Sequence, residues 1–333
     1  MVKVSIISLI YCSKKYADGI FQSVQRFTPM ISRGEAEFFF IANDPTDEIV
    51  KHLTEKGYPF FLNKNERKTN EELFSRGYGT PEYIHRVYRG FNLGILKSKG
   101  EIVVLLNSDN CVSPDWLENL LKYLGPNTIV TSHLVERSHP AYGVFPGAYH
   151  CEFGHHPDNF DEERFLDFVL RYKMTGIIDG GAYMPCAFYK KNAVTVGLYP
   201  EGNIAGKTFD DVIEYGDENF FRKLADNGIV HVTSLDSIVY HFKEGEMDDT
   251  NEGQLNLAIP KKNIKQPHHF PLKSIMIATV NSSEFLTFDK NFILFTCIKS
   301  ITTKAKKKFI RMKNRIGLIK NKILQKKSGQ LKR

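Results

Sequence analysis

Short polar side chains follow directly after a buried apolar run near the middle of the first half of the sequence. Residues 101–106 predict a buried strand, with an unbroken apolar run from Ile102 to Leu106, and Asn107-Ser-Asp-Asn110 comes next. In an open α/β sheet, ligands bind just beyond the carboxyl ends of the strands. A carboxylate fixed at such an edge can hold a divalent cation against a phosphate oxygen. A polar strand exit is also ordinary turn chemistry, so this segment alone leaves both interpretations open.

Two later carboxylates and a histidine have side chains suited to a group-transfer reaction. Asp217 and Glu218 stand at the start of a predicted helix. Negative charge there interacts favourably with the helix dipole and by itself stabilises the helix by about 0.3 to 1 kcal/mol. The functional alternative is that Asp217 faces a cleft as a general base, with Glu218 as its substitute. His241 ends a strand-like segment, where a histidine is either a structural residue or a ligand. Residue types alone leave each of these roles open.

Strands and helices alternate over the first 125 residues. Apolar runs predict strands at 3–11, 37–42, 59–62 and 101–106. Helical spacing predicts helices at 16–28 and 81–98, and a third helix that is capped by Thr46 or Asp47 and continues to residue 56. This alternation predicts an α/β fold with a doubly wound, mainly parallel sheet flanked by helices. The strand exits then place Tyr11, Asn43-Asp44 and 107–110 at one edge, as a nucleotide crevice requires. Neither G-x-G-x-x-G nor G-x-x-x-x-G-K-[ST] occurs, so dinucleotide and P-loop sites lose their main support.

The pattern after residue 110 is less regular. Ser113 and Pro114 predict the start of a helix that continues to 124, and polar residues 63–80 predict a loop able to order over a ligand. Further strands are predicted at 129–135 and 182–189, a cleft-lining loop at 136–160, an amphipathic helix at 161–174, and two strand-like segments at 229–233 and 237–241.

The composition is that of a globular protein long enough for one α/β domain with an appendage. Of 333 residues, 42% are apolar and 25% are charged. The five cysteines are scattered and form no C-x-x-C pair, which favours a reducing compartment, the cytoplasm, over a disulfide framework. No apolar run approaches the ~20 residues that span a bilayer, and residues 1–12 are typical of a first strand and not of a signal peptide.

The positive charge is confined to the last part of the chain. The net charge is +7, but residues 301–333 hold 13 Lys and Arg and no Asp or Glu, which leaves 32 basic against 38 acidic residues in 1–300. An acidic body argues against nucleic-acid binding. Apolar residues recur every three or four positions in the tail, which predicts a basic amphipathic helix suited to an anionic membrane surface. A solvated tail and a partner-binding helix are the alternatives.

The order of these motifs resembles that of the family 2 glycosyltransferases, inverting enzymes of GT-A fold, over about residues 1–245. Asn107-Ser-Asp109 occupies the D-x-D position, and Asp109 matches its second, metal-binding Asp. Asp217 matches the catalytic Asp of the E-D-x-D motif, and His241 resembles the histidine that often completes the metal or diphosphate site. The other matches are the first strand with Tyr11, Asn43-Asp44 at the place of the family's acidic pair, the N-x-G helix at Asn92-Leu-Gly94, and the turn at 196–201.

The resemblance implies transfer of a sugar from a nucleotide-diphosphate sugar to a hydroxyl of a glycan or a lipid-linked acceptor. Asp217 would be the general base, with Glu218 behind it, and a divalent cation, Mn²⁺ or Mg²⁺, would be held by Asp109 and His241. Lys243 or Arg89 would add positive charge near the diphosphate. The donor-binding residues implied in this way are Tyr11, Asn43, Asp44, Asn92, Asn107 and Asp109.

Two positions depart from the family pattern. Asn107 replaces the first Asp of D-x-D, and Gly216 replaces the Glu before the catalytic Asp. Loss of a carboxylate weakens metal binding, yet Mg²⁺ usually takes only one or two protein carboxylates, so Asp109 can suffice. The departures leave open a non-catalytic sugar-nucleotide or glycan-binding relative, and the α/β pattern leaves open a nucleotidyltransferase.

The resemblance and the charge pattern together predict three parts. Residues 1–245 would form the glycosyltransferase domain, with the nucleotide-sugar half at 1–125 and the acceptor half at 126–245. Residues 246–300 would pack the basic tail, 301–333, against that domain. We therefore expect a cytoplasmic enzyme of polysaccharide biosynthesis that is held peripherally at the inner face of a membrane.

Overall fold

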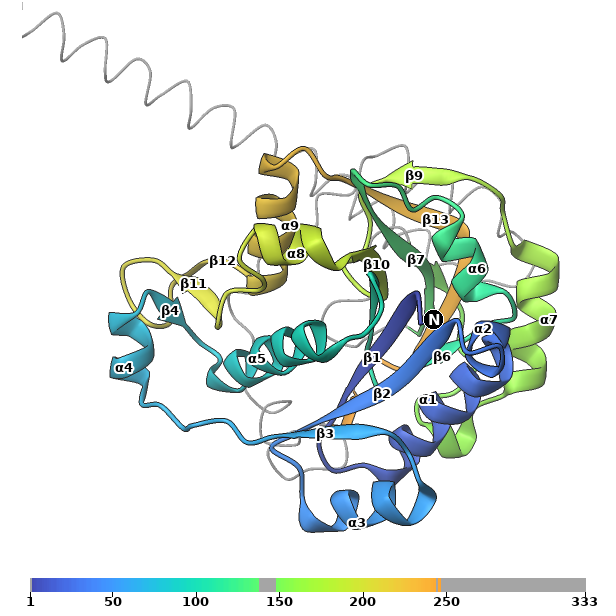
Figure 1. Ribbon diagram of the computed structural model, residues 1–333, viewed down its shortest axis with the longest axis horizontal. Helices are drawn as coiled ribbons and strands as arrows, with labels where there is room; N and C mark the ends of the chain where they lie inside the picture. Colours follow the sequence, from blue (N-terminus) through green and yellow to red (C-terminus); the bar gives the residue numbers. More distant parts are fainter. Residues whose placement is uncertain (1, 138–147, 244, 247–333) are drawn as a thin grey trace, which may run out of the picture. The chain divides into compact units, whose positions relative to one another are not determined.

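The strands that carry the sequence motifs run parallel, so their carboxyl ends meet at one edge of a sheet (Figure 1). The computed structural model describes residues 2–137, 148–243 and 245–246. Across the main sheet the parallel strands are β3 (Phe60–Asn63), β2 (Ala36–Asn43), β1 (Val4–Ile10), β5 (Ile102–Leu106), β7 (Thr128–Glu136) and β13 (Val230–His241). β10 (Cys186–Tyr189) lies between β5 and β7 and is antiparallel to both. β6 (Asn110–Val112) and β9 (Ile177–Asp179) are antiparallel to β13, and β8 (Tyr149–His150) is parallel to β7. This mainly parallel α/β sheet confirms the predicted fold class.

The inner strands are apolar without a break because both of their faces are covered. Along β5, Val104 and Leu106 belong to one hydrophobic core, and Val103 and Leu105 belong to a second core on the opposite face. The side chains of a strand alternate between its two faces, so a strand that is buried on both reads as a continuous apolar run. The sequence signal at 101–106 arises from this double burial.

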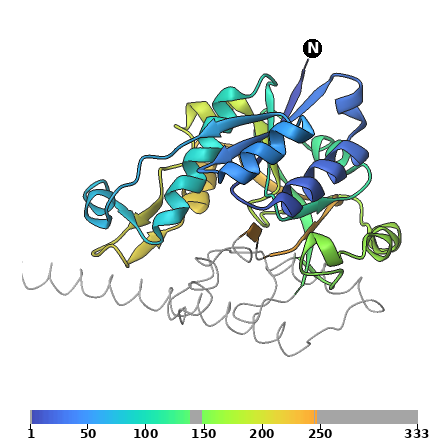
Figure 2. The ribbon, with the colours of Figure 1, turned by 90° about the horizontal axis from the view of Figure 1, so that it is seen from below.

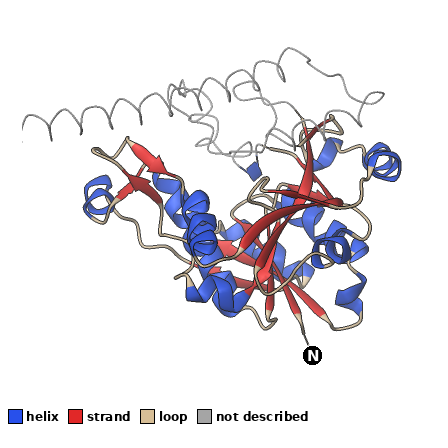
Figure 3. Cartoon of the chain, turned by 90° about the horizontal axis from the view of Figure 1, so that it is seen from above, coloured by secondary structure: helices blue, strands red, loops and turns tan. Residues whose placement is uncertain are grey.

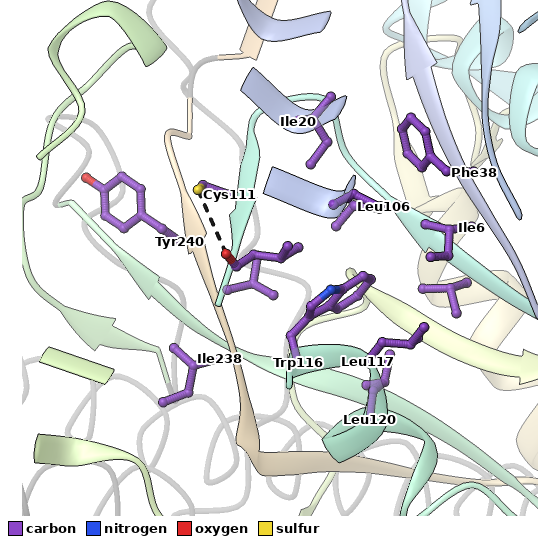
Figure 4. Close-up of a cluster of buried hydrophobic side chains, with 14 of the residues drawn as sticks. Ile6, Ile20, Phe38, Leu106, Cys111, Trp116, Leu117, Leu120, Ile238 and Tyr240 are labelled. Carbon is purple, nitrogen blue, oxygen red and sulfur yellow. Dashed lines mark hydrogen bonds between the residues drawn. The ribbon is translucent and has the colours of Figure 1, made fainter. Parts of the chain in front are cut away.

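Helices cover both faces of the main sheet (Figure 3). One face carries α1 (Lys14–Phe27), α2 (Pro29–Ser32), α3 (Asp47–Lys56), α6 (Trp116–Leu121), η1 (Pro157–Asn159) and α7 (Glu162–Tyr172); the other carries α5 (Glu82–Lys97), α8 (Lys190–Thr195) and α9 (Gly216–Asp226). Figure 4 shows Trp116 in the first core with Ile6, Leu106 and Leu117 around it. The indole N–H of Trp116 donates to Thr28 Oγ1 at 3.0 Å, which satisfies its polar group inside this core.

A second, three-stranded sheet was not predicted. The polar stretch 63–80, predicted as a loop, contains α4 (Asn70–Ser75) and β4 (Tyr78–Gly79). β4 pairs with β11 (Asn203–Ala205), which pairs with β12 (Val212–Glu214), and with α4 they lie to one side of the main sheet (Figure 2). His85 joins this sheet to α5, because its ring nitrogens lie 3.0 Å from Gly79 O and 2.9 Å from Glu201 O.

Three further predictions were wrong in detail. α6 begins two residues later than predicted, and Ser113 does not cap it, because Ser113 Oγ donates instead to Ile238 O at 2.7 Å. The strand predicted at 182–189 is confined to β10. The two segments predicted at 229–233 and 237–241 are one strand, β13, with an irregularity between Ser234 and Ile238 that divides the apolar pattern.

The predictions for the last quarter of the chain fall almost entirely outside the described residues. Of the packing segment 246–300 only Glu246 is described, and the tail 301–333 is not. Over the described ranges, no helix is both long enough and apolar enough to cross a membrane.

Candidate active site at the carboxyl edge of the sheet

The carboxyl ends of β5, β7 and β13 bring together side chains that are far apart in sequence. His241, the last residue of β13, lies in register with Glu136, the last residue of β7. On the opposite side His241 is in register with Asn110 of β6, the residue that follows Asp109. The fold therefore places Asp109, His241 and Glu136 next to one another.

A row of four charged side chains runs through this edge. Asp109 Oδ2 lies 3.1 Å from His241 Nε2, and His241 Nδ1 lies 2.9 Å from Glu136 Oε2. The other oxygen of Glu136 lies 3.0 Å from Lys243 Nζ. Burial by itself lowers the pKa of His241, but the carboxylates of Asp109 and Glu136 outweigh it and raise that pKa to about 9. Each buried charge in the row thus faces an opposite charge.

Asp109 and His241 fit a divalent cation that takes other ligands from outside the protein. A carboxylate oxygen and an imidazole nitrogen converge, and the second imidazole nitrogen is held by a carboxylate, which is the usual setting of a metal-binding histidine. In the part of the chain that the structure describes, no group of three or more His, Cys, Asp or Glu side chains is arranged to hold a metal ion. A cation here would complete its shell with water or phosphate oxygens, as Mg²⁺ usually does.

The carboxylate of Glu246 sits in a ring of hydrogen-bond donors beside Asp109. It accepts from the backbone N–H groups of Tyr11 (3.0 Å), Cys12 (2.6 Å) and Ser13 (2.8 Å), just before α1 begins, and from Ser108 Oγ (3.2 Å). Burial raises the pKa of Glu246, and the three N–H groups and the hydroxyl act against that rise. Glu246 thus ties the chain after β13 to the exits of β1 and β5.

Asn43 and Asp44 belong to a separate polar cluster at the exit of β2. Asn43 Oδ1 accepts from the side-chain amides of Asn63 (2.7 Å) and Asn65 (2.9 Å). Asp44 accepts from the backbone N–H of Asn65 at 2.7 Å and lies 3.6 Å from an Arg86 guanidinium nitrogen. Asp44 has a φ of 50°, a left-handed conformation that Asp tolerates better than most residues. The two side chains are thus held in fixed orientations before any ligand binds.

Asp217 stands in the first turn of α9 and is partly buried. Burial raises the pKa of its carboxyl to about 6, and the backbone N–H of Glu218, which donates to Asp217 Oδ1 at 2.9 Å, acts against that rise. Burial raises the pKa values of Tyr183 and Tyr215, and the negative charge of Asp217 raises them further. Both phenols therefore lie near the Asp217 carboxylate. A carboxylate with a pKa near neutrality among tyrosine side chains can accept a proton at physiological pH.

The structure gives a steric reason for glycine at position 216. A Cβ atom on Gly216 would lie 2.2 Å from the ring of Tyr88, and Tyr88 Oη accepts the backbone N–H of Asp217 at 3.3 Å. The Gly216 N–H also donates to Asn203 Oδ1 at 3.0 Å. Tyr88 therefore occupies the space that a glutamate at position 216 would need, and any side chain there must displace the group that positions Asp217.

Other candidate residues are engaged with the protein itself. Asn92 donates to Tyr199 O and accepts from Tyr199 N–H, both at 2.9 Å, and so fixes α5 to the turn at 196–201. Arg89 lies 3.4 Å from Glu201, and Lys243 is turned onto Glu136, so the predicted extra charge near a diphosphate is paired here. Asn107 closes the turn after β5 by donating its backbone N–H to Asn110 Oδ1 at 3.1 Å.

Sequence reasoning missed Glu136 and Glu246. Glu136 had a local signal, because it is a charged residue at the end of the apolar strand predicted at 129–135. Glu246 had none, since its partners at 11–13 lie more than 230 positions earlier in the chain. Both residues entered the site only through the fold.

Residues 70–195, which include the exit of β5, match the family described as glycosyl transferase family 2. The matched segment includes the N-x-G helix and the D-x-D position, and it agrees with the resemblance seen in the sequence motifs. Among curated proteins, none matches this sequence.

Solved structures similar to this chain include GalNAc-T7 with UDP, GalNAc and Mn²⁺, at 16% identity and a TM-score of 0.46, covering 72% of this chain and 44% of that one. Staphylococcus aureus TarS 1–349 matches at 15% identity and a TM-score of 0.43, covering 72% and 60% of the two chains. TarS 1–349 in complex with UDP-GlcNAc matches at 13% identity and a TM-score of 0.45, covering 72% and 58%. This chain thus spans 44% to 60% of the solved chains that it matches.

Proposed function

Because residues 70–195 match glycosyl transferase family 2, we propose that this chain is an inverting glycosyltransferase that moves a sugar from a nucleotide-diphosphate donor to an acceptor hydroxyl. The observation that carries the proposal is the convergence of Asp109, inside the matched segment, with His241 at the carboxyl edge of the sheet. In an α/β sheet this edge is where ligands bind.

Asp109 and His241 would hold a divalent cation, Mn²⁺ or Mg²⁺, against the donor diphosphate. Such a cation, when bound, neutralises the negative charge that develops on the leaving nucleoside diphosphate. The nucleoside would be bound by Tyr11 and the cluster of Asn43 and Asp44, whose side chains are already oriented by Asn65 and Arg86. Asn107 would contribute an uncharged oxygen in place of the first Asp of the family motif.

Asp217 would be the general base of the reaction, with Glu218 next to it. As the acceptor oxygen forms its bond to the anomeric carbon, its proton passes to the Asp217 carboxylate. The bond between the anomeric carbon and the diphosphate oxygen breaks on the opposite side, and its electron pair leaves with the nucleoside diphosphate. A pKa of about 6 keeps Asp217 ionised at neutral pH and basic enough to take that proton.

A glycan or lipid-linked saccharide is the acceptor class that the surroundings of Asp217 favour. The side chains of Tyr183 and Tyr215 are partly buried near this carboxylate, and that of Tyr83 lies near Tyr215. Aromatic rings present flat apolar surfaces with a polar tip, which suits the apolar faces and hydroxyl groups of a sugar.

A panel of UDP-, GDP-, TDP- and CMP-sugars, assayed with and without Mn²⁺, tests the function. We expect one donor to be hydrolysed slowly in the absence of acceptor, with release of its nucleotide, and the rate to fall when Mn²⁺ is chelated. A donor that raises the melting temperature but is never turned over would support the non-catalytic alternative, which Asn107 and Gly216 favour. Nucleotide incorporation from a sugar phosphate and a nucleoside triphosphate would instead indicate a nucleotidyltransferase.

The basic tail would hold the enzyme at an anionic membrane surface on the cytoplasmic side, close to a lipid-linked acceptor. The support is the 13 Lys and Arg at 301–333 without any acidic residue. Deletion of 301–333 should move the protein from the pellet to the supernatant when it is sedimented with phosphatidylglycerol vesicles. Phosphatidylcholine vesicles are the control, and equal pelleting of both forms on anionic vesicles would contradict the proposal.

A further inference from the structure

Glu136 is a fully buried carboxylate whose two oxygens have different partners. Its side chain is 0% exposed at the end of β7. Oε2 lies 2.9 Å from His241 Nδ1, and Oε1 lies 3.0 Å from Lys243 Nζ. A buried charge costs several kcal/mol of solvation unless a partner compensates for it. Lys243, which is also almost fully buried, is that partner.

The contact with Glu136 determines which nitrogen of His241 faces Asp109. An ionised carboxylate only accepts hydrogen bonds, so Nδ1 must carry the proton in this contact. Nε2 is then directed at Asp109 Oδ2, 3.1 Å away, and presents its lone pair there once it is deprotonated. Without the acceptor, a free imidazole prefers to carry its proton on Nε2, the nitrogen that a cation would need.

The backbone around this contact is held in an unusual conformation. Lys243 has a φ of 87°, in the left-handed region that a lysine rarely adopts, and this turn brings Nζ back onto Glu136. Lys243 Nζ also donates to Arg137 O at 3.3 Å, and Arg137 Nε donates to Phe242 O at 3.2 Å. The Phe242 N–H in turn donates to Asp109 O at 2.9 Å, so the ends of β7 and β13 are fixed to the exit of β5.

We propose that Glu136, with Lys243 as its counter-ion, is a positioning residue that holds His241 with Nε2 directed at the cation site beside Asp109. The inference rests on the proposed role of Asp109 and His241. It goes beyond that role because it assigns the orientation of the histidine to two residues outside the family motifs. Glu136 would act on the cation site only through His241, because its two oxygens face His241 and Lys243.

The variant that tests the proposal is Glu136→Leu combined with Lys243→Met. Replacing both members of a buried ion pair with apolar residues is often neutral for stability, whereas removing one member is strongly destabilising. We expect the double variant to fold and its affinity for Mn²⁺, measured by electron paramagnetic resonance, to fall about 10- to 100-fold. Glu136→Gln combined with Lys243→Met keeps an oxygen that can accept from Nδ1–H, and its loss of affinity should be smaller.

The matched control is a buried carboxylate on β13, the strand that carries His241, with a half-exposed lysine as its partner. Asp236 of β13 is 2% exposed and lies 3.0 Å from Lys122 Nζ. Asp236→Asn combined with Lys122→Met should leave Mn²⁺ affinity within about twofold of wild type. If the Glu136 variant also stays within about twofold, Glu136 does not position His241. If both variants lose affinity equally, the effect is one of stability and the proposal is overturned.

A second measurement separates this proposal from the proposed function, because it requires no metal. Nitrogen-15 NMR of the imidazole of His241 at pH 10 reports which nitrogen carries the proton. We expect the Nδ1–H form in wild type and in the Glu136→Gln, Lys243→Met variant, and the Nε2–H form in the Glu136→Leu, Lys243→Met variant. An unchanged tautomer would overturn the positioning role. Failure of wild type to bind Mn²⁺, with the tautomer shift present, would count against the cation site alone.

Discussion

Replacing Asp217 by Asn should abolish glycosyl transfer and leave donor binding near its wild-type strength. General bases contribute about 10² to 10⁴-fold to a rate, and an amide cannot take the acceptor proton. We expect kcat to fall by at least about 10²-fold, while the dissociation constant of the donor, measured by calorimetry, changes by less than about threefold. Retained turnover would show that another group, with Glu218 the first candidate, is the base.

The same substitution should raise stability, in contrast to its effect on activity. The pKa of Asp217 is raised by burial from 3.8 to about 6, so the folded protein disfavours the ionised carboxylate at neutral pH, at a cost on the order of 2 to 3 kcal/mol. Because the folded state binds the proton more tightly than the unfolded chain, this cost disappears as the pH falls from about 6 to 4. Urea unfolding at pH 7.5 should therefore show Asp217→Asn to be more stable than wild type, and the difference should shrink at pH 4.5.

A matched control lies on the same helix. Asp226 is exposed near the end of α9, 3.0 Å from Arg222, and Asp226→Asn should change neither kcat nor the pH dependence of the rate. In wild type the rate should fall as the pH drops through about 6, because the base becomes protonated. A rate that stays constant between pH 7 and 5 would contradict the assignment of Asp217.

Asp109→Asn should remove most of the dependence of the reaction on Mn²⁺. The substitution takes away the only carboxylate that the D-x-D position retains, and metal stabilisation of a leaving group is worth several kcal/mol. A loss of about 4 kcal/mol corresponds to about 10³-fold in kcat/KM. In wild type, Mn²⁺ should raise the melting temperature, because it binds only the folded protein, and this increase should be absent in the variant.

The control for Asp109 is a second aspartate and histidine pair. Asp18 Oδ1 lies 2.8 Å from His52 Nε2, between α1 and α3. Asp18→Asn should leave the effect of Mn²⁺ on both rate and melting temperature unchanged. If Asp109→Asn kept a wild-type response to Mn²⁺, the cation would have to bind elsewhere, and the role of His241 would fall with it.

The strand and helix pattern was predictable where burial is regular. β1, β2 and β5 are apolar on both faces, and α1, α5 and α9 bury one face, so their periodicity is visible in the sequence. β4, β11 and β12 have two or three residues each, too few for any period to show. β13 was divided into two because Ser234, Asp236 and Ser237 interrupt its apolar run. These polar residues are buried, with partners contributed by α6 and β7.

The candidate site was predictable only as separate pieces. Asp109 and His241 were recognised by motif order, but their 3.1 Å approach depends on β13 entering the sheet between β7 and β6. Glu136 became part of the site through register, because it is the residue opposite His241 on β7. A sequence pattern states which residue types are present at a strand exit. The order of the strands in the sheet decides which exits are neighbours, and a short motif contains no information about that order.

The position of Glu246 has a consequence for how the protein is made. Residues 11–13 leave the ribosome early, and the carboxylate that their N–H groups hold follows only after more than 230 further residues. β13 is also translated late, yet β6 joins the main sheet through it. Contacts of such long sequence separation form slowly. The contacts that Glu246 makes with residues 11–13 and Ser108 can therefore form only after residue 246 has been synthesised.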